Sequence, residues 1–396
     1  MVDHTSRIEP AKLEELPESI ADTIAELSAA SAILGSALHS TTAANLASLV
    51  RVMNTYYSNL IEGHNTRPRD IERALIGDFD NDDEKRNLQI EASSHVRVQA
   101  EIDRMAAANA LPEPASQDFI QWIHSEFYRD APRELLRIKG AHAEFIMEPG
   151  ELRSIGMQDV AVGRHIPPSS DRIKEFMKYF ESRYQFSNMG KAARISAIAS
   201  AHHRFNYIHP FPDGNGRVSR LMSHAMALKA GIGAHGLWSV SRGLARGLES
   251  RSEYKRMLDH ADMPRQGDLD GRGNLSHRGL IEFTDWFLKV CLDQVNFMSS
   301  LFDLENLERR LGIYVSRSET LKPEAYKLLQ EALIRGQFDR GDAMHITGLP
   351  ERSARRVLND LISDGMLSSA SPKTPVSLRF PSDNLEVLFP KLYPET

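Results

Sequence analysis

The segment from His209 to Arg220, HPFPDGNGRVSR, determines how two helices of this chain meet. A preceding helix has to end near His209, because the residue before Pro210 is pushed out of the α region. The segment is therefore predicted to be a loop that leads into a helix N-terminus. That second helix is expected to start near Asn215 or Gly216, because apolar residues return after the loop at helical spacing: Val218, Leu221, Met222 and Ala225.

The glycines of this loop favour an anion. Gly214–Gly216 (Gly-Asn-Gly) frees backbone N–H groups and lets a ligand approach the backbone closely. The dipole of the following helix adds positive potential at the same place. Arg217 and Arg220 lie three residues apart, so both guanidinium groups rise from one side of the first turn. Their forked donors suit phosphate oxygens, and the segment predicts a phosphate-binding site.

Two further residues bring chemistry to that site. Asp213 offers a hard oxygen ligand beside the glycines, which suits a Mg²⁺ ion that bridges two phosphates. His209 can accept a proton from an incoming hydroxyl at neutral pH. The alternative is an ordinary helix N-cap with surface arginines. The pattern H-P-F-x-x-G-N-G-R-x-x-R fixes eight positions. At roughly 1 in 20 per position, a chance match in this chain has odds on the order of 10⁻⁸.

The complete pattern resembles the signature of the Fic family, and the resemblance covers roughly Gln117 to Leu288. It implies an all-helical core and the transfer of AMP from ATP-Mg²⁺ to a Ser, Thr or Tyr hydroxyl of a target protein. The implied roles are the following: His209 as base, Asp213 as Mg²⁺ ligand, Gly214, Asn215 and Gly216 as anion hole, and Arg217 and Arg220 as holders of the β- and γ-phosphates.

A second, shorter motif lies upstream. The residues from Ser58 to Gly63, SNLIEG, fit [S/T]-x-x-x-E-[G/N], the inhibitory helix of autoinhibited Fic proteins. By that resemblance, Glu62 would pair with Arg220 and occupy the space that the γ-phosphate needs. A carboxylate and a phosphate would then compete for one guanidinium group. The alternative is a helix C-terminus with Gly63 as its cap, and both interpretations can hold at once.

Two parts of the chain would complete the site. Residues 150–170 hold three glycines, short β-prone pieces and a Pro-Pro pair, which predicts a hairpin or an extended flap. In the Fic family the flap, here Arg153–Pro168, would pair with an extended target segment. Tyr254 lies where relatives carry an adenine-pocket tyrosine, although Lys255 replaces the second tyrosine that they often have. Core packing is the alternative for Tyr254.

The last part of the chain changes pattern. A helix opening at Pro323, a short helix, a turn, a third helix and two β-prone pieces predict a winged helix-turn-helix. Residues 351–380 could contact a DNA backbone through cations on the third helix and near the possible wing: Arg352, Arg355, Arg356, Lys373 and Arg379. Against this, the net charge over Pro323–Phe380 is 8 − 7 = +1, counted from its Lys, Arg, Asp and Glu residues. A protein-contact or packing role is the alternative for this module.

Composition sets wider limits. Hydrophobic residues make up 41% of the 396 residues and charged residues 26%, as in a chain that buries a sizeable core. The net charge of −6 argues against a general binder of polyanions. The single cysteine, Cys291, excludes an internal disulfide. The apolar stretches are too short to cross a bilayer. These features favour a cytoplasmic protein without a membrane partner.

We therefore predict a mainly α fold in three parts. They are an N-terminal helical region (1–112) with the inhibitory motif, an all-helical Fic core with a small β-hairpin flap (113–315), and a winged-helix domain (316–396). The predicted function is that of a protein adenylyltransferase using ATP and Mg²⁺, autoinhibited by Glu62. A homodimer and DNA are further candidate partners. Two alternatives stay open: a hydrolase that removes AMP from a modified protein, and a DNA-binding regulator whose core senses nucleotide.

Overall fold

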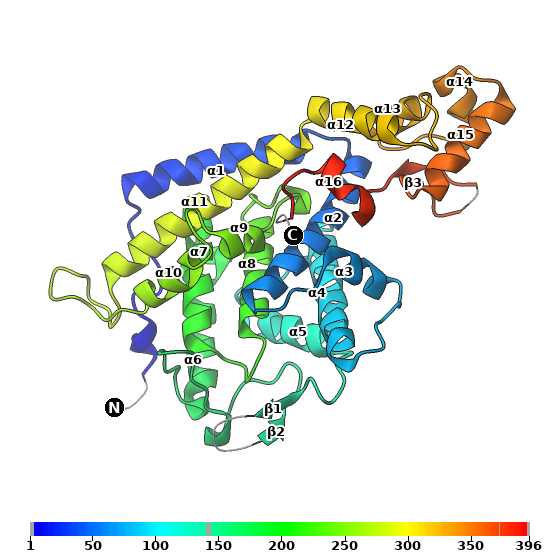
Figure 1. Ribbon diagram of the computed structural model, residues 1–396. Helices are drawn as coiled ribbons and strands as arrows, with labels where there is room; N and C mark the ends of the chain where they lie inside the picture. Colours follow the sequence, from blue (N-terminus) through cyan, green and yellow to red (C-terminus); the bar gives the residue numbers. More distant parts are fainter. Residues whose placement is uncertain (1–3, 140–143, 372, 394–396) are drawn as a thin grey trace. The chain divides into compact units, whose positions relative to one another are not determined.

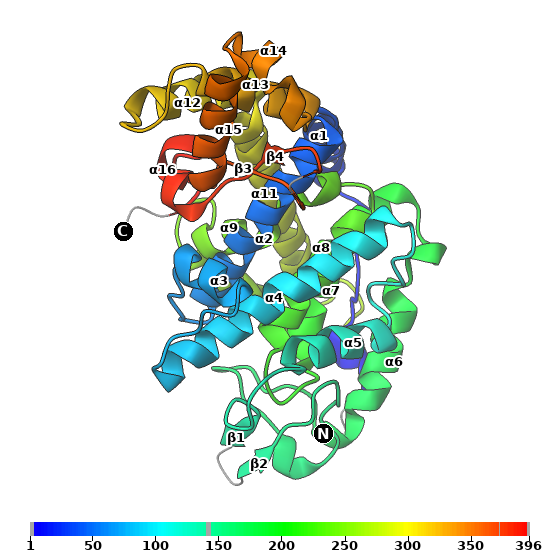
Figure 2. The same ribbon diagram turned by 90° about the vertical axis from the view of Figure 1, so that its right-hand side faces the viewer.

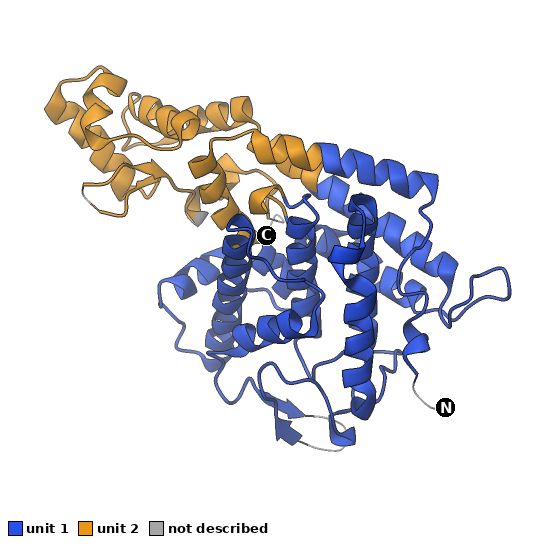
Figure 3. Cartoon of the chain, turned by 180° about the vertical axis from the view of Figure 1, so that it is seen from behind, with its two compact units in different colours: residues 1–29, 54–233, 239–294 blue, residues 30–53, 234–238, 295–396 orange. Residues whose placement is uncertain are grey.

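The computed structural model describes residues 4–139, 144–371 and 373–393 and is mainly helical, which confirms the predicted fold class (Figure 1). The chain divides into two compact units (Figure 3). One comprises residues 1–29, 54–233 and 239–294, and the other residues 30–53, 234–238 and 295–396. The boundary between the units falls inside three helices: α1 (Glu18–Ser36), α2 (Ser40–Ile61) and α11 (His277–Phe302). The three-part division predicted at 1–112, 113–315 and 316–396 stays a prediction.

The first unit contains the helices that surround the motif loop. Besides its parts of α1, α2 and α11 it holds α3 (Pro68–Leu75), α4 (Asp83–Ala107), α5 (Gln117–Tyr128), α6 (Ile173–Tyr184), α7 (Lys191–Ile208), α8 (Asn215–Lys229), α9 (Val240–Arg246) and α10 (Glu253–Ala261). Short 3₁₀ turns occur at Thr5–Ile8, Gly156–Gln158, Ser170–Arg172 and Phe186–Asn188.

Helices α7 and α8 form the centre of this unit. They pack along one another, and α8 also packs against α4 and α5 (Figure 2). Almost every residue of α7 from Ile195 to Ile208 is buried. Its many Ala and Ser side chains suit this position, because a helix that is enclosed on all sides needs small residues for close contact. The loop between these two buried helices is therefore held firmly from both ends.

The first antiparallel hairpin of the structure lies upstream of the segment predicted to be the flap. Strands β1 (Arg137–Lys139) and β2 (Glu144–Ile146) pair antiparallel, with Ile138 opposite Phe145. The segment from 150 to 170 is extended instead, with one isolated bridge between Val162 and His165. A ladder does not develop there, since a 3₁₀ turn interrupts the segment at Gly156–Gln158 and the prolines 167 and 168 donate no N–H. Of the two predicted forms, the extended one is correct.

The second unit contains the C-terminal elements in the predicted order. Helix α12 (Leu304–Arg317) precedes α13 (Ala325–Arg335), α14 (Ala343–Thr347) and α15 (Glu351–Ser363). Strands β3 (Leu367–Ser368) and β4 (Ser377–Leu378) then pair antiparallel, and α16 (Leu385–Leu388) follows. Two further 3₁₀ turns lie at Ala234–Gly236 and Arg340–Asp342, and another at Ser382–Asn384. The apolar face of α15 is buried as its periodicity predicts: Ala354, Val357, Leu358 and Leu361.

Hydropathy along the helices bears on membranes. Among the residues that the structure describes, no helix combines the length and apolar character needed to cross a bilayer.

Candidate active site

The motif loop has the predicted helix–loop–helix form. Helix α7 ends at Ile208, and His209 follows in the left-handed region with φ 51° and ψ 60°. Its N–H still bonds to the carbonyl of Phe205 at 2.9 Å, so the turn closes the helix while it redirects the chain. Histidine is among the residues more often found in this region, and such backbone positions cluster at functional sites. Helix α8 then begins at Asn215, as predicted.

Asn215 closes the loop with its side chain. Its Oδ1 accepts the N–H of Phe211 at 2.9 Å, and its Nδ2 donates to the carbonyl of the same residue at 2.8 Å. Gly214, just before it, has φ 78°. A Cβ atom there would lie 2.8 Å from the ring and hydroxyl of Tyr128, so both the backbone and the space require glycine. The loop is thus fixed in shape independently of any ligand.

A carboxylate approaches the N-terminus of α8. A Cβ atom on Gly216 would lie 2.5 Å from Oε1 of Glu62 and 3.1 Å from Nη1 of Arg220. The glycine therefore makes room for an anionic group beside the first turn of the helix. This is where free N–H groups and the helix dipole favour negative charge.

Arg220 holds that carboxylate in a partly buried contact. Its Nη2 donates to Oε1 of Glu62 at 2.6 Å, and its Nε donates to Oγ of Ser58 at 2.9 Å. Arg220 is 1% exposed, whereas the side chain of Glu62 retains 32% exposure. Burial alone would raise the pKa of Glu62, but Arg220 and then Arg217 outweigh it and hold the pKa below its usual value. The glutamate is therefore ionised at neutral pH.

The end of α2 presents Glu62 and is capped by Gly63. The N–H of Gly63 bonds to the carbonyl of Leu60 at 3.1 Å, and that of His64 bonds to the carbonyl of Asn59 at 2.9 Å. With φ 90° at Gly63, this is a Schellman cap. The capping interpretation and the Glu62–Arg220 contact therefore coexist, while inhibition itself stays a prediction.

Arg217 lies in a different network from Arg220. Its Nη1 donates to Oε1 of Glu91 at 2.7 Å and to the hydroxyl of Tyr128 at 3.1 Å, and its guanidinium lies over the ring of Phe127. Burial raises the pKa of Glu91, in spite of Arg217 beside it. Within the described part of the chain, the residues lining the pocket beside the motif loop include Arg220 but not Arg217. The two motif arginines thus have separate surroundings.

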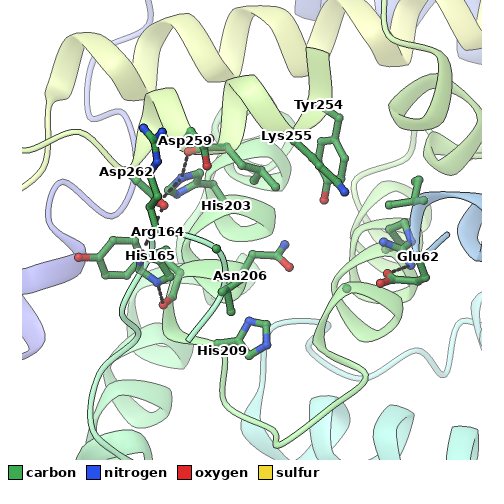
Figure 4. Close-up of a pocket in the computed structure, with 17 residues that line it drawn as sticks. Glu62, Arg164, His165, His203, Asn206, His209, Tyr254, Lys255, Asp259 and Asp262 are labelled. Atoms are coloured by element: carbon green, nitrogen blue, oxygen red, sulfur yellow. Dashed lines mark hydrogen bonds and ion pairs between the residues drawn. The ribbon is translucent and has the colours of Figure 1, made fainter. Parts of the chain in front are cut away.

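The pocket beside the loop has a volume of about 710 Å³. His209 lines it together with Glu62, Tyr254 and Lys255, which Figure 4 shows around the open space. The remaining lining residues come from the extended segment, α7, α8, α10 and the end of α2: Ile61, Val162, Gly163, Arg164, His165, His203, Asn206, Tyr207, Gly216, Arg220, Leu258, Asp259 and Asp262.

Tyr254 is both a pocket and a packing residue. It is buried, its hydroxyl lies 2.7 Å from Nε2 of His202, and its ring stacks on Trp286 with centroids 6.3 Å apart. Burial raises its pKa, so the phenol stays protonated. Tyr254 thus packs in the core and lines the pocket, while contact with an adenine stays a prediction. Lys255 beside it is exposed and also lines the pocket.

A buried arginine that sequence reasoning missed ties the extended segment to the motif loop. Arg153 donates from Nε to the carbonyl of His209 at 2.8 Å and from Nη2 to the carbonyl of Pro168 at 3.0 Å. Its N–H also bonds to the carbonyl of Pro210 at 2.9 Å. Burial, followed by the charge of Arg153, lowers the pKa of His209 to about 4. The imidazole is consequently neutral at pH 7 and able to accept a proton.

The far end of the extended segment is held by Asp262. Its Oδ1 lies 3.0 Å from Nε2 of His203, and its Oδ2 lies 3.5 Å from Nδ1 of His165 (Figure 4). His165 also contacts the carbonyl of Tyr207 through Nε2 at 2.7 Å. Within the described residues, no group of three or more His, Cys, Asp or Glu side chains has the geometry of a metal site. The extended segment is therefore anchored at one end by Arg153 and at the other by the contact of His165 with Asp262.

Asp213 suits a cation that arrives with phosphates. It is exposed, and its Oδ2 accepts the hydroxyl of Tyr128 at 3.1 Å. Its other oxygen, Oδ1, has no hydrogen bond within the described residues, and it is a hard donor of the type that Mg²⁺ prefers. A lone carboxylate beside a phosphate site fits Mg²⁺, because this ion is usually held by one or two carboxylates and the substrate phosphates.

The comparisons with known proteins agree with this geometry. Residues 114–227 match the model of the Fic/DOC family. Protein adenylyltransferase Fic of Aedes aegypti is 36% identical over 85 residues, which are 22% of this chain and 16% of that protein. Its namesake of Drosophila erecta is 37% identical over 98 residues, or 25% and 19% of the two chains. The matched stretches thus span less than a fifth of these relatives.

A solved structure extends the likeness of fold. The structure of a Fic family protein from Desulfovibrio desulfuricans G20 covers 92% of this chain, and 97% of that chain is matched. The TM-score is 0.54 and the sequence identity 17%, so this likeness concerns the fold alone. Together with the complete motif between α7 and α8, the comparisons show that residues 114–227 belong to a Fic/DOC family domain within a longer chain.

Proposed function

We propose that this chain is a protein adenylyltransferase that transfers AMP from ATP-Mg²⁺ to a hydroxyl of a target protein and is restrained by Glu62. One observation carries the proposal: the carboxylate of Glu62 is bound by Arg220 against the N-terminus of α8, in the pocket that His209 lines. An anion site beside a neutral histidine is what transfer of a nucleotidyl group to a hydroxyl requires.

The residues would share the reaction as follows. The target hydroxyl attacks the α-phosphorus, the bond to the β-phosphate breaks, and pyrophosphate leaves. An imidazole nitrogen of His209 accepts the hydroxyl proton. The N–H groups of Gly214–Gly216 and the guanidinium of Arg220 would stabilise the phosphate charge. Asp213 would hold Mg²⁺, which neutralises charge on the phosphates when bound.

Arg217 would contribute less directly. Its guanidinium is engaged by Glu91 and Tyr128, so a phosphate contact needs a change in its surroundings. Direct binding of a phosphate by Arg217 therefore remains a prediction that rests on the resemblance alone.

A matched pair of labels tests the reaction. The full chain carrying Glu62→Gly is incubated with a mixture of candidate target proteins, Mg²⁺ and ATP labelled at either the α- or the γ-phosphate. Transfer of AMP predicts protein-bound label from α-labelled ATP and none from γ-labelled ATP. Label from the γ-position alone would identify a kinase and contradict the proposal. As a control, adding EDTA should abolish the labelling.

The hydrolase alternative uses the same residues in reverse. There, Glu62 would orient a water toward an AMP already attached to a protein. The wild-type chain and the Glu62→Gly chain are each given a protein that carries AMP, without ATP. Release of AMP that requires Glu62 would favour the hydrolase, whereas release below detection, together with α-label transfer, would favour the transferase.

The extended segment supports a protein substrate. Arg153–Pro168 borders the pocket through Val162–His165 and presents exposed apolar side chains that an extended peptide could contact: Ile155, Met157, Val162 and Ile166. Backbone pairing along this segment would bring a target hydroxyl to His209. Formation of a homodimer and a location in the cytoplasm remain predictions from the sequence.

For the C-terminal elements we infer a winged helix-turn-helix, for which DNA is one candidate partner and another protein is the alternative. The order of α13, α14, α15 and the β3–β4 pair supports this, as do the exposed cations on α15 and the hairpin: Arg352, Arg355, Arg356, Lys373 and Arg379. Duplex binding that weakens with salt and is lost in Arg352→Ala/Arg356→Ala would support the regulator hypothesis. Binding that is unchanged in this variant would leave protein contact as the role of the module.

A further inference from the structure

Helix α5 presents two buried side chains to the motif loop. His124 and Tyr128 lie one helical turn apart, and both are almost completely buried. The helix starts at Gln117, where Oγ of Ser116 accepts the N–H of Phe119, and it packs against α8. Both side chains contact Asp213, one at its backbone and one at its carboxylate.

His124 fixes the backbone of Asp213. Its Nδ1 accepts the N–H of Gly150 at 2.8 Å, so the ring proton lies on Nε2. This nitrogen faces the carbonyl of Asp213 at 3.3 Å and donates to it. The ring stacks on Phe211, with centroids 3.9 Å apart and planes inclined by 15°.

Tyr128 fixes the carboxylate of Asp213. Its hydroxyl oxygen accepts Nη1–H of Arg217 at 3.1 Å, and the hydroxyl proton is therefore free to go to Oδ2 of Asp213, also at 3.1 Å. Glu91 holds the same Arg217 nitrogen at 2.7 Å and keeps the donor in place. A directed chain of hydrogen bonds thus ends on one oxygen of Asp213.

We propose that His124 and Tyr128 are positioning residues that hold Asp213 at two points and turn its Oδ1 toward a divalent cation bound with nucleotide phosphates. The proposal rests on the proposed function, in which Asp213 is the metal ligand. A ligating carboxylate whose second oxygen accepts a hydrogen bond has a fixed orientation, and such outer contacts commonly govern metal affinity. His124 and Tyr128 would act through Asp213, without touching the nucleotide.

The test measures metal binding directly. Mn²⁺ is titrated into the full chain carrying Glu62→Gly and saturated with α,β-methylene-ATP, and electron paramagnetic resonance gives the fraction bound. In Tyr128→Phe, which removes only the hydroxyl, the affinity for Mn²⁺ is expected to fall about tenfold or more. Affinity for the metal-free nucleotide, measured separately by calorimetry, is expected to stay unchanged.

Two further variants make the outcome specific. Tyr184→Phe removes another buried hydroxyl, which bonds to the carbonyl of Ala11 far from the loop in sequence, and should leave Mn²⁺ affinity unchanged. Asp213→Asn should weaken Mn²⁺ binding at least as much as Tyr128→Phe. If Asp213→Asn has no effect, the metal assignment itself fails. If Asp213→Asn weakens binding and Tyr128→Phe does not, or if Tyr128→Phe weakens metal-free nucleotide equally, the positioning role is overturned.

Discussion

Replacing His209 by alanine in a chain that already carries Glu62→Gly is expected to lower the rate of AMP transfer roughly 10²- to 10⁴-fold. The imidazole lines the pocket, and its pKa of about 4 keeps it neutral at pH 7. Alanine removes the proton acceptor but leaves Arg220 and the N-terminus of α8 in place. The measurement is single-turnover transfer at saturating ATP-Mg²⁺, with nucleotide affinity determined in parallel.

The pH profile provides a second readout of the same residue. The neutral imidazole is the active form, and it is the form present above the lowered pKa. The rate should therefore change little from about pH 8 to about pH 6 and fall as the pH approaches about 4. His260→Ala, on α10 and paired with Glu282 outside the pocket, is the matched control and should keep the full rate. Undiminished transfer by the His209→Ala chain would contradict the assignment.

Replacing Glu62 by glycine is expected to raise AMP transfer roughly ten- to hundredfold, since a charge-assisted hydrogen bond is worth about 1.5–3 kcal/mol and about 1.4 kcal/mol is a factor of ten. Removing the carboxylate frees Arg220 and the N-terminus of α8 for phosphate. Glycine is tolerated at this position, because α2 has already ended at Ile61. Initial rates of α-label transfer at fixed ATP-Mg²⁺ give the ratio of variant to wild type.

Two controls separate charge from backbone effects. Glu62→Gln keeps the length of the side chain without its charge and should give an intermediate rate. Glu249→Gly changes an exposed glutamate in a loop and should leave the rate as in the wild type. If Glu62→Gly binds ATP but transfers no faster than the wild type, restraint by this carboxylate is wrong. The assay for AMP release then decides whether Glu62 serves hydrolysis instead.

The features of the fold and the site that could be predicted are those determined by residues close together in the sequence. Pro210 and the glycines at 214 and 216 locate the loop between α7 and α8, since their effects on backbone geometry act within a few residues. The spacing of Ser58 and Glu62 also suffices to align both with Arg220, because one turn of α2 separates them. Local sequence thus predicts the position of the motif loop between α7 and α8 and the contact of the end of α2 with Arg220.

The parts that could not be predicted depend on packing between distant segments. Glu91 lies on a helix with many charged residues, and nothing in its neighbourhood separates it from a surface glutamate. Arg153 likewise resembles an exposed arginine of a loop, yet it is buried among carbonyl groups. The hairpin formed by β1 and β2 lies upstream of residues 150–170, where the sequence also predicts β structure, and only tertiary contacts distinguish the two segments.

The close approach of Glu62 to Gly216 has a consequence for how regulation can be lost. On the proposed function, the carboxylate of Glu62 and the incoming phosphate bind at one anion site, made of Gly216 and Arg220. A side chain added at Gly216, or the loss of Arg220, would therefore prevent binding of both the Glu62 carboxylate and the phosphate, and the protein would be inactive. Only changes at Glu62 and its neighbours in α2 can remove the inhibition and still leave the anion site able to bind phosphate. Constitutively active variants are thus confined to the end of α2, whereas inactivating variants can arise at any residue of the anion site.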